Sequence, residues 1–292
     1  MISFRHHVVS LVAVLVALAA GIALGGGPLS DLGRTASPKL RAENDQLRAE
    51  LTAAHGATGL ADGLAEQYAD RLVGGTLKEL RIALVTLPGS DSKIASGLSE
   101  TVKLAGGTVV ATYELQAKAY NTSGKSLVDT LGAQLADDVD AVPADATTYT
   151  RLGALLAAGI VGDGEAATSL LSSLGSAGLV TAPDEPAPAD LVLVVVGQKA
   201  SAVETDALAG LFTGLDGGVD GSVVVASTGS AESGLLRGLR ADPTWSEVGS
   251  SADSAQTGAG RISAVLALAA DAAGGTGHYG AFGSDGAAPG SD

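Results

Sequence analysis

An uncharged apolar run near the amino terminus constrains this chain more than any other feature. The seventeen residues from Val8 to Leu24 read VVSLVAVLVALAAGIAL. Extended to Gly27, the run has twenty residues, and a helix of that length, rising about 1.5 Å per residue, covers the roughly 30 Å hydrocarbon core of a bilayer. The sequence therefore predicts a transmembrane anchor over residues 8–27, preceded by a short tail of residues 1–7.

Two fates of this apolar segment fit the sequence. A cleaved signal peptide also has an apolar stretch followed by small residues, and Ala17-Leu18-Ala19 would serve as its cleavage site. The apolar run continues beyond Ala19 to Leu24, which favours a retained single-pass anchor. Basic residues flank the run on both sides, so charge alone does not fix its orientation. The short amino-terminal tail favours a location in the cell membrane with the carboxyl-terminal part outside the cytoplasm.

A charged helical pattern, PKLRAENDQLRAELTAA, begins at Pro38. One set of positions within it is spaced alternately four and three residues apart and forms a candidate dimer seam: Leu40, Asn44, Leu47, Leu51 and Ala54. These are alternating d and a positions of a heptad, and an Asn at an a position favours a parallel two-stranded register. The sequence predicts a coiled-coil stalk over residues 38–74 that pairs into a homodimer. The alternative is a lone amphipathic helix that lies on its own domain.

Glycines divide the predicted stalk. His55-Gly56 and Gly59 are expected to interrupt the helix. A second segment follows, with apolar residues four apart at Leu60, Leu64, Tyr68 and Leu72. A stripe of this kind is typical of core packing.

Beyond Leu80, short apolar runs alternate with helical patterns. The runs 81–87 and 108–115 flank a predicted helix at 92–105, which indicates a βαβ unit with parallel strands. The most hydrophobic run, 190–197, is expected at the centre of the sheet. Further helices are predicted near 125–136, 149–160, 165–176, 202–214, 231–240 and 258–273, and a further strand at 222–227.

This alternation predicts an α/β fold with a doubly wound, mainly parallel sheet and flanking helices over residues 80–273. The remaining stretch, 274–292, is rich in Gly and is expected to be a flexible tail.

Charge and residue types exclude several functions. Residues 81–292 carry ten Lys or Arg and twenty-four Asp or Glu, a net charge of −14, which disfavours nucleic acid as a partner. The chain has no Cys, so disulfides, thiolate metal sites and Cys nucleophiles are excluded. The acidic residues Asp137, Asp138 and Asp140 are interpreted as a solvated loop.

No catalytic pattern stands out either. The chain lacks a G-x-S-x-G elbow, and His278, the one His of the predicted domain and its tail, has no Ser that the sequence places beside it. The loops 87–92 and 229–232 follow strands but lack a dinucleotide or Walker pattern. They are interpreted as ordinary turns, the first capped by Asp91 or Ser92. We expect a protein that is not an enzyme, with no identifiable catalytic, cofactor-binding or metal-binding residue.

Three stretches together resemble a known family. They are MISFRHHVVSLVAVLVALAAGIALGGGPL at the start, IALVTLPGSD after the stalk, and SSADSAQTGAGRISAVLALAADAAGGTGHYG near the end. In these stretches the chain is similar to the mycobacterial copper transport protein B family of actinobacterial envelopes. The resemblance implies a role in copper transport or efflux across the envelope, and some members are described as outer-membrane proteins. Copper is implied by this resemblance alone.

The architecture also fits a second role. Related proteins of this type have also been linked, together with a second membrane protein, to the control of cell-wall hydrolysis during division. An anchored, dimeric protein with an acidic domain suits such an envelope scaffold. The expected partners are therefore the lipid bilayer, a second copy of the chain and a membrane protein.

Overall fold

The computed structural model describes residues 11–20, 28–139 and 142–290, and for 28–39 it describes the backbone alone. The chain divides into two compact units, residues 1–60 and residues 61–292. One long helix, α2 (Pro28–Val73), contains the boundary between them.

The predicted anchor falls largely outside the described residues. Of residues 8–27, the structure describes 11–20, which are helical and expose their apolar side chains. Within the described ranges, no helix combines the length and apolarity needed to cross a bilayer. The anchor over residues 8–27 stays a prediction.

Helix α2 is unbroken over 46 residues. The predicted interruption at His55-Gly56 and Gly59 is wrong, because both glycines lie inside this helix. A glycine costs a helix only about 1 kcal/mol relative to alanine, and strong helix formers such as Ala, Leu, Arg and Glu surround these positions.

The second unit is built on one sheet, and its seven described strands lie in the order β3-β2-β1-β4-β5-β6-β7. All neighbouring strands are parallel except the edge pair β2 and β3. The strands are β1 (Arg81–Thr86), β2 (Thr108–Leu115), β3 (Val180–Thr181), β4 (Leu191–Val195), β5 (Gly221–Val225), β6 (Ser250–Ala252) and β7 (His278–Tyr279). The sheet is therefore mixed but mostly parallel, and β4 is its central strand, as its sequence predicts.

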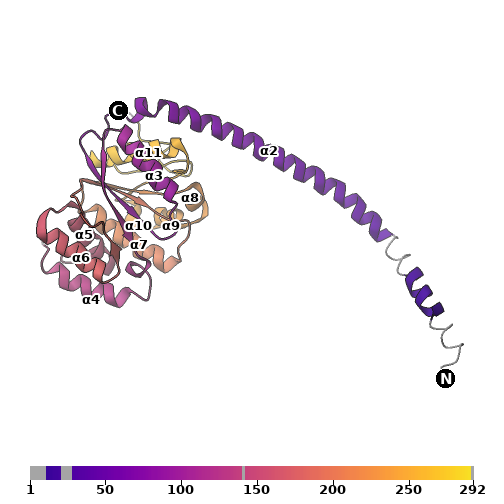
Figure 1. Cartoon of the computed structure of the whole chain (residues 1–292), viewed down its shortest axis with the longest axis horizontal. Coiled ribbons are helices and arrows are strands. Elements are labelled where there is room, and N and C mark those ends of the chain that lie inside the picture. The colour runs from indigo at the N-terminus through magenta and orange to yellow at the C-terminus, as the bar shows by residue number, and fades with distance from the viewer. Residues whose placement is uncertain (1–10, 21–27, 140–141, 291–292) are drawn as a thin grey trace, which may run out of the picture. The chain divides into compact units, whose positions relative to one another are not determined.

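Helices cover both faces of the sheet (Figure 1). One face packs against the end of α2, α3 (Ser92–Leu104) and α11 (Gly258–Ala272). The other face packs mainly against α5 and α7, with smaller helices around them. The elements of this second face are η1 (Ala117–Ala119), α4 (Lys125–Ala136), α5 (Thr148–Val161), α6 (Gly164–Ser176), α7 (Ala202–Asp216), α8 (Thr228–Ser233), α9 (Leu235–Ala241) and α10 (Pro243–Ser246).

Alternation along the central strands feeds the two cores. Val192 and Val194 of β4 belong to the core under α5 and α7, while Leu193 and Val195 belong to the core under α3 and α11. A strand buried on both faces needs apolar residues at every position, and this explains the continuous hydrophobic run.

The carboxyl-terminal stretch differs from the flexible tail expected over residues 274–292. Residues His278–Tyr279 form β7, which pairs with β6. Beyond the strand, the Gly280 amide donates to the Gly286 carbonyl at 2.9 Å and the Asp285 amide donates to the His278 carbonyl at 3.0 Å. Paired backbone and buried contacts outweigh the conformational freedom that the glycines bring, so the described part of this stretch belongs to the fold.

Candidate functional site

The candidate dimer seam lies on the described, helical part of α2. Leu40, Leu47 and Leu51 are 64%, 59% and 56% exposed, and Asn44 and Ala54 are also exposed. Full burial of a leucine side chain contributes about 1.5–3 kcal/mol, so a row of exposed leucines on one helix face is costly for a helix without a partner. Such exposed apolar surface is typical of interaction sites.

A second row on the same helix corrects the expectation of core packing. Leu60, Leu64, Tyr68 and Leu72 are all exposed, between 43% and 68%. The residues of α2 that enter the core beneath α3 and α11 are instead Ala69 and Val73, with Ala65 partly buried beside them. The small side chains of Ala65 and Ala69 allow α2 to approach the domain closely. The four-residue spacing of the larger apolar side chains shows that they share a helix face, but it does not show whether that face is covered.

Two carboxylates of α2 contact α11. Asp62 Oδ1 accepts hydrogen bonds from the Gly258 and Ala259 amides. These amides lie at the start of α11, where the helix itself provides no acceptor. Glu66 Oε1 lies 2.9 Å from Arg261 Nη2. The last turns of α2 are therefore joined to the domain by polar contacts as well as by packing.

The loops that follow β1 and β4 meet at the position where open α/β sheets often bind ligands. Gly197 packs so tightly there that a Cβ on it would lie 3.0 Å from the Pro88 carbonyl oxygen. Asp91 caps α3, since its Oδ1 accepts from the Lys93 amide at 2.9 Å. Ser230 is buried and donates to the Gly197 carbonyl at 2.9 Å. The cap confirms the predicted turn and helix start at 87–92, whereas residues 229–232 lie inside α8 and are not the turn that the sequence predicts.

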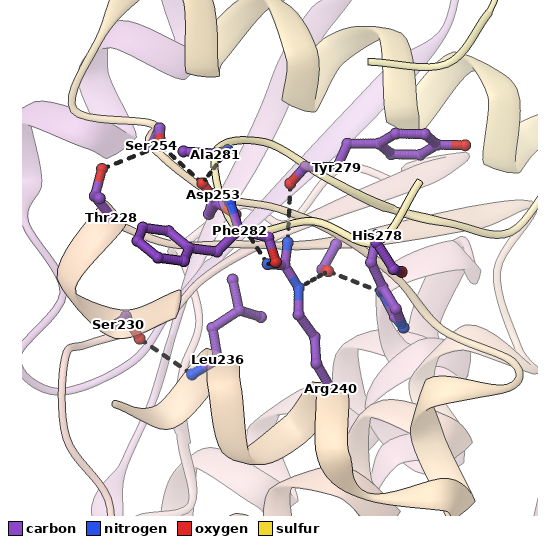
Figure 2. A network of polar contacts seen from close by, with 12 residues as sticks. Thr228, Ser230, Leu236, Arg240, Asp253, Ser254, His278, Tyr279, Ala281 and Phe282 are labelled. Carbon is purple, nitrogen blue, oxygen red and sulfur yellow. Dashed lines mark hydrogen bonds and ion pairs between the residues drawn. The ribbon is translucent and has the colours of Figure 1, made fainter. Parts of the chain in front are cut away.

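A buried ion pair holds the carboxyl-terminal stretch against β6 (Figure 2). Arg240 Nη1 lies 2.8 Å from Asp253 Oδ2, and the two side chains are 10% and 0% exposed. The same guanidinium donates to the carbonyls of Tyr279 at 2.9 Å and Phe282 at 3.0 Å. Asp253 also accepts from the amides of Ala281 and Phe282, at 2.8 and 3.1 Å. The hydrogen-bond partners named here for Arg240 and Asp253 all belong to the same chain, so these contacts give the ion pair a structural role.

The sequence places no Ser beside His278, but the structure does. Ser251 Oγ lies 2.9 Å from His278 Nδ1, while His278 Nε2 lies 3.2 Å from the Ser246 carbonyl. The carbonyl requires a donor, so Nε2 carries the proton and Nδ1 accepts from the Ser251 hydroxyl. Pairing of β6 with β7 creates this contact, and 27 residues separate the two side chains in the sequence.

This Ser–His pair is enclosed by its surroundings. Ser251 is fully buried and its oxygen also accepts from Arg240 Nε at 2.9 Å. Trp245 stacks on His278 with ring centroids 5.5 Å apart. Burial, followed by the nearby Arg240 charge, lowers the pKa of His278. These contacts give the pair a structural role in joining β6, β7 and α10.

Two carboxylates lie near the amino-terminal ends of β5 and β6. Asp216 Oδ1 accepts from Ser222 Oγ at 2.7 Å, and Asp271 accepts from the Ser222 amide at 2.7 Å and from the Ser250 hydroxyl. Burial raises the pKa of Asp216 to about 6, and it also raises the pKa of Asp271. Within the described ranges, no three or more His, Cys, Asp or Glu residues gather closely enough to hold a metal ion. Asp140 of the predicted acidic loop lies outside those ranges.

Comparisons with known proteins find similarity over nearly the whole length of the chain. The sequence model of the family described as copper transport outer membrane protein, MctB, matches residues 1–289. Copper transporter MctB of Mycobacterium tuberculosis (strain ATCC 25618 / H37Rv) is 28% identical over 314 residues, covering 96% of this chain and 96% of that protein. Copper transporter MctB of Mycobacterium leprae (strain TN) is 28% identical over 320 residues, with the same 96% coverage of both chains. The similarity extends over both units.

Proposed function

This chain belongs to the MctB copper transport family, and from that premise we propose that it is a non-enzymatic envelope protein that takes part in copper transport and works as a self-associated assembly. Family membership supports the link to copper. The exposed seam on α2 supports the assembly.

The main support for self-association is the exposure of three leucines on one face of α2. Within the part of the chain that the structure describes, Leu40, Leu47 and Leu51 belong to neither hydrophobic core. Pairing of two such helices removes these side chains from water, and each buried leucine contributes about 1.5–3 kcal/mol. The seam is thus a surface on which the chain gains stability from a second copy.

Complementation of a deletion strain tests the proposal. The wild-type gene should restore growth on copper and lower the copper content of the cells. A Leu47→Glu/Leu51→Glu variant should fail, because the charges prevent burial of the seam. An Ala49→Glu variant is the matched control, since Ala49 lies on the opposite side of the same helical turn, and it should restore growth.

Two outcomes would contradict this function. A deletion strain with unchanged copper tolerance and copper content would oppose the copper role. Full complementation by the seam variant, at wild-type amounts in the membrane fraction, would oppose the need for assembly.

We further propose that the chain is a single-pass membrane protein whose second unit lies outside the cytoplasm. The uncharged run of residues 8–27 supports this location. The chain has no Cys, so a Glu165→Cys substitution at an exposed site introduces one reactive thiol. A membrane-impermeant maleimide should label this variant in intact spheroplasts, whereas labelling only after lysis would place the domain inside.

An apolar groove favours the second candidate function, an envelope scaffold that helps control cell-wall hydrolysis. The groove, of about 510 Å³, lies between α4, α5 and α6, and Leu135, Val139 and Leu170 line it. Asp138 and Asp163 lie at the same groove, so its chemistry fits a partner segment with apolar and basic side chains.

Loss of this scaffold should produce chained cells or altered lysozyme sensitivity without a copper phenotype. An Ala166→Arg substitution places bulk and positive charge in the groove and should reproduce that phenotype. Ser172→Arg, on the same helix but outside the groove, should behave as wild type. Normal division in the deletion strain would rule the scaffold out.

A further inference from the structure

We propose that the second copy pairs with α2 in parallel and in register, held by reciprocal ion pairs between Glu43 of one chain and Arg48 of the other. This pairing rests on the self-association proposed above and specifies its geometry. In this dimer, the seam of each chain packs against the same segment of an identical chain.

The charged residues beside the seam favour a parallel dimer. With Asn44 and Leu51 at a positions, Arg48 falls at an e position and Glu43 at a g position of the heptad. The neighbouring heptads repeat the pattern, with Arg41 at e and Glu50 at g. All basic residues next to the seam are therefore on one flank, and all acidic residues are on the other.

Only one orientation pairs opposite charges. In a parallel dimer a g residue faces the e residue of the following heptad on the partner, which brings Glu43 to Arg48 twice by symmetry. Glu50 faces His55 in the same way. In an antiparallel dimer g faces g and e faces e, so Glu would meet Glu and Arg would meet Arg.

The side chains of Glu43 and Arg48 form no ion pair with another described residue of their own chain. The side-chain hydrogen bond nearby joins Gln46 Nε2 to Glu50 Oε1 at 2.9 Å along the same helix. Among the described residues, pairing with a second copy therefore breaks no intramolecular ion pair.

Two further features fit a two-stranded seam. Asn44 lies between apolar layers, where an in-register dimer brings the two amides together so that each satisfies the other. Two glycines that follow the seam in the helix, Gly56 and Gly59, fall at f and b positions, outside the seam. A Cβ at either glycine would meet nothing within 4 Å, so neither one is required by packing inside its own chain.

Disulfide trapping in the full chain tests the orientation. Since the chain has no Cys, a Leu40→Cys variant in membranes should form a covalent dimer with itself on mild oxidation. The Ala42→Cys variant, on the outer face of the same turn, should cross-link at least about tenfold more slowly. An antiparallel pair aligns a positions with d positions, so a dimer that sets Leu40 against Leu51 would instead trap Leu40→Cys only when mixed with Leu51→Cys, and that result would overturn the proposal.

Charge exchange tests the ion pairs. Arg48→Glu should weaken self-association about tenfold, because two attractive contacts per dimer become repulsive. The double variant Glu43→Arg/Arg48→Glu should restore it, since the pairs reform with exchanged signs. Asp45→Arg, which alters charge at an outer b position, should leave the dissociation constant within about twofold.

The outcomes separate the geometry from the proposed function. A solubilised wild-type chain that stays monomeric at every concentration would contradict the assembly and its geometry together. A chain that dimerises but traps only the mixed Leu40→Cys and Leu51→Cys pair would contradict the parallel register alone. Dimerisation that the double charge variant fails to restore would contradict the Glu43–Arg48 pairing.

Discussion

At the scale of single residues, the ion pair of Arg240 and Asp253 shows how polar chemistry is used for structure. Both side chains are almost completely buried, and the carboxylate accepts from two backbone amides of the stretch after β7. Gly280, with a φ of 117°, lets the backbone turn beside this carboxylate. A loop rich in Gly and Ala is ordered because these contacts satisfy its backbone groups.

Removal of the Asp253 carboxylate should therefore be costly. Asp253→Ala leaves Arg240 as an uncompensated buried charge, and we expect the free energy of unfolding to fall by about 3–5 kcal/mol, as measured by urea denaturation. Limited proteolysis should then cut near Gly280. Glu79→Gln, which removes one member of the exposed Lys78–Glu79 pair, should leave stability unchanged. An Asp253→Ala variant as stable as the wild type would show that the pair does not hold the carboxyl-terminal stretch.

Asp216 should make stability depend on pH. Burial raises its pKa from 3.8 to about 6, opposed by the hydrogen bond from Ser222 and reinforced by the Asp271 charge. Because the folded state prefers the protonated acid, this contribution is fully present below pH 3.8 and is lost as the pH rises through about 6. Its size is at most about 3 kcal/mol.

The comparison with Asp216→Asn isolates that contribution. The variant should unfold at a higher temperature than the wild type at pH 7.5, and the difference should shrink as the pH falls toward 4. Thermal melts followed by circular dichroism across this range provide the measurement. A difference that stays constant with pH would contradict a raised pKa.

At the scale of elements, α2 illustrates what propensity predicts and what it does not. Gly56 and Gly59 suggested an interruption, but the helix continues through both. Since a Cβ at either position would meet open space, alanine there should stabilise the helix by about 1 kcal/mol per site. A peptide or full chain with both replacements should show higher helicity and a higher melting temperature. Lower helicity would mean that the glycines serve a bend.

Asn44 should specify the oligomer formed by α2. Asn44→Leu is expected to change the oligomer size or the register, because an apolar a position no longer requires two matched amides. Sedimentation of the full chain should show larger species or a mixture. A variant with unchanged mass and unchanged Leu40→Cys cross-linking would show that Asn44 determines neither the size nor the register of the oligomer.

Strand and helix alternation was readable from the sequence where each element is long and apolar. The strands 81–86, 108–115, 191–195 and 221–225 coincide with predicted runs. The short strands β3, β6 and β7 were missed, because two or three residues carry no periodicity and depend on their neighbours. The exposed Leu64 and Tyr68 were read as core for a related reason: their spacing shows that one face is apolar but not whether that face is covered.

At the scale of the whole molecule, the α/β class could be predicted from the sequence alone. The Ser251–His278 contact could not, since it depends on pairing between β6 and β7 across 27 residues. Once seen, its burial and its contact with Arg240 explain it as structure. Family membership, which covers residues 1–289, links this architecture to copper transport in the cell envelope.

We propose that the chain works as a dimer through the seam on α2. Sedimentation equilibrium of the full chain, solubilised in a density-matched detergent, measures the protein mass directly. We expect the mass of two chains for the wild type and for Ala49→Glu, and of one chain for Leu47→Glu/Leu51→Glu. A wild-type mass of one chain over the whole concentration range, or a dimer unaffected by the seam substitutions, would contradict it.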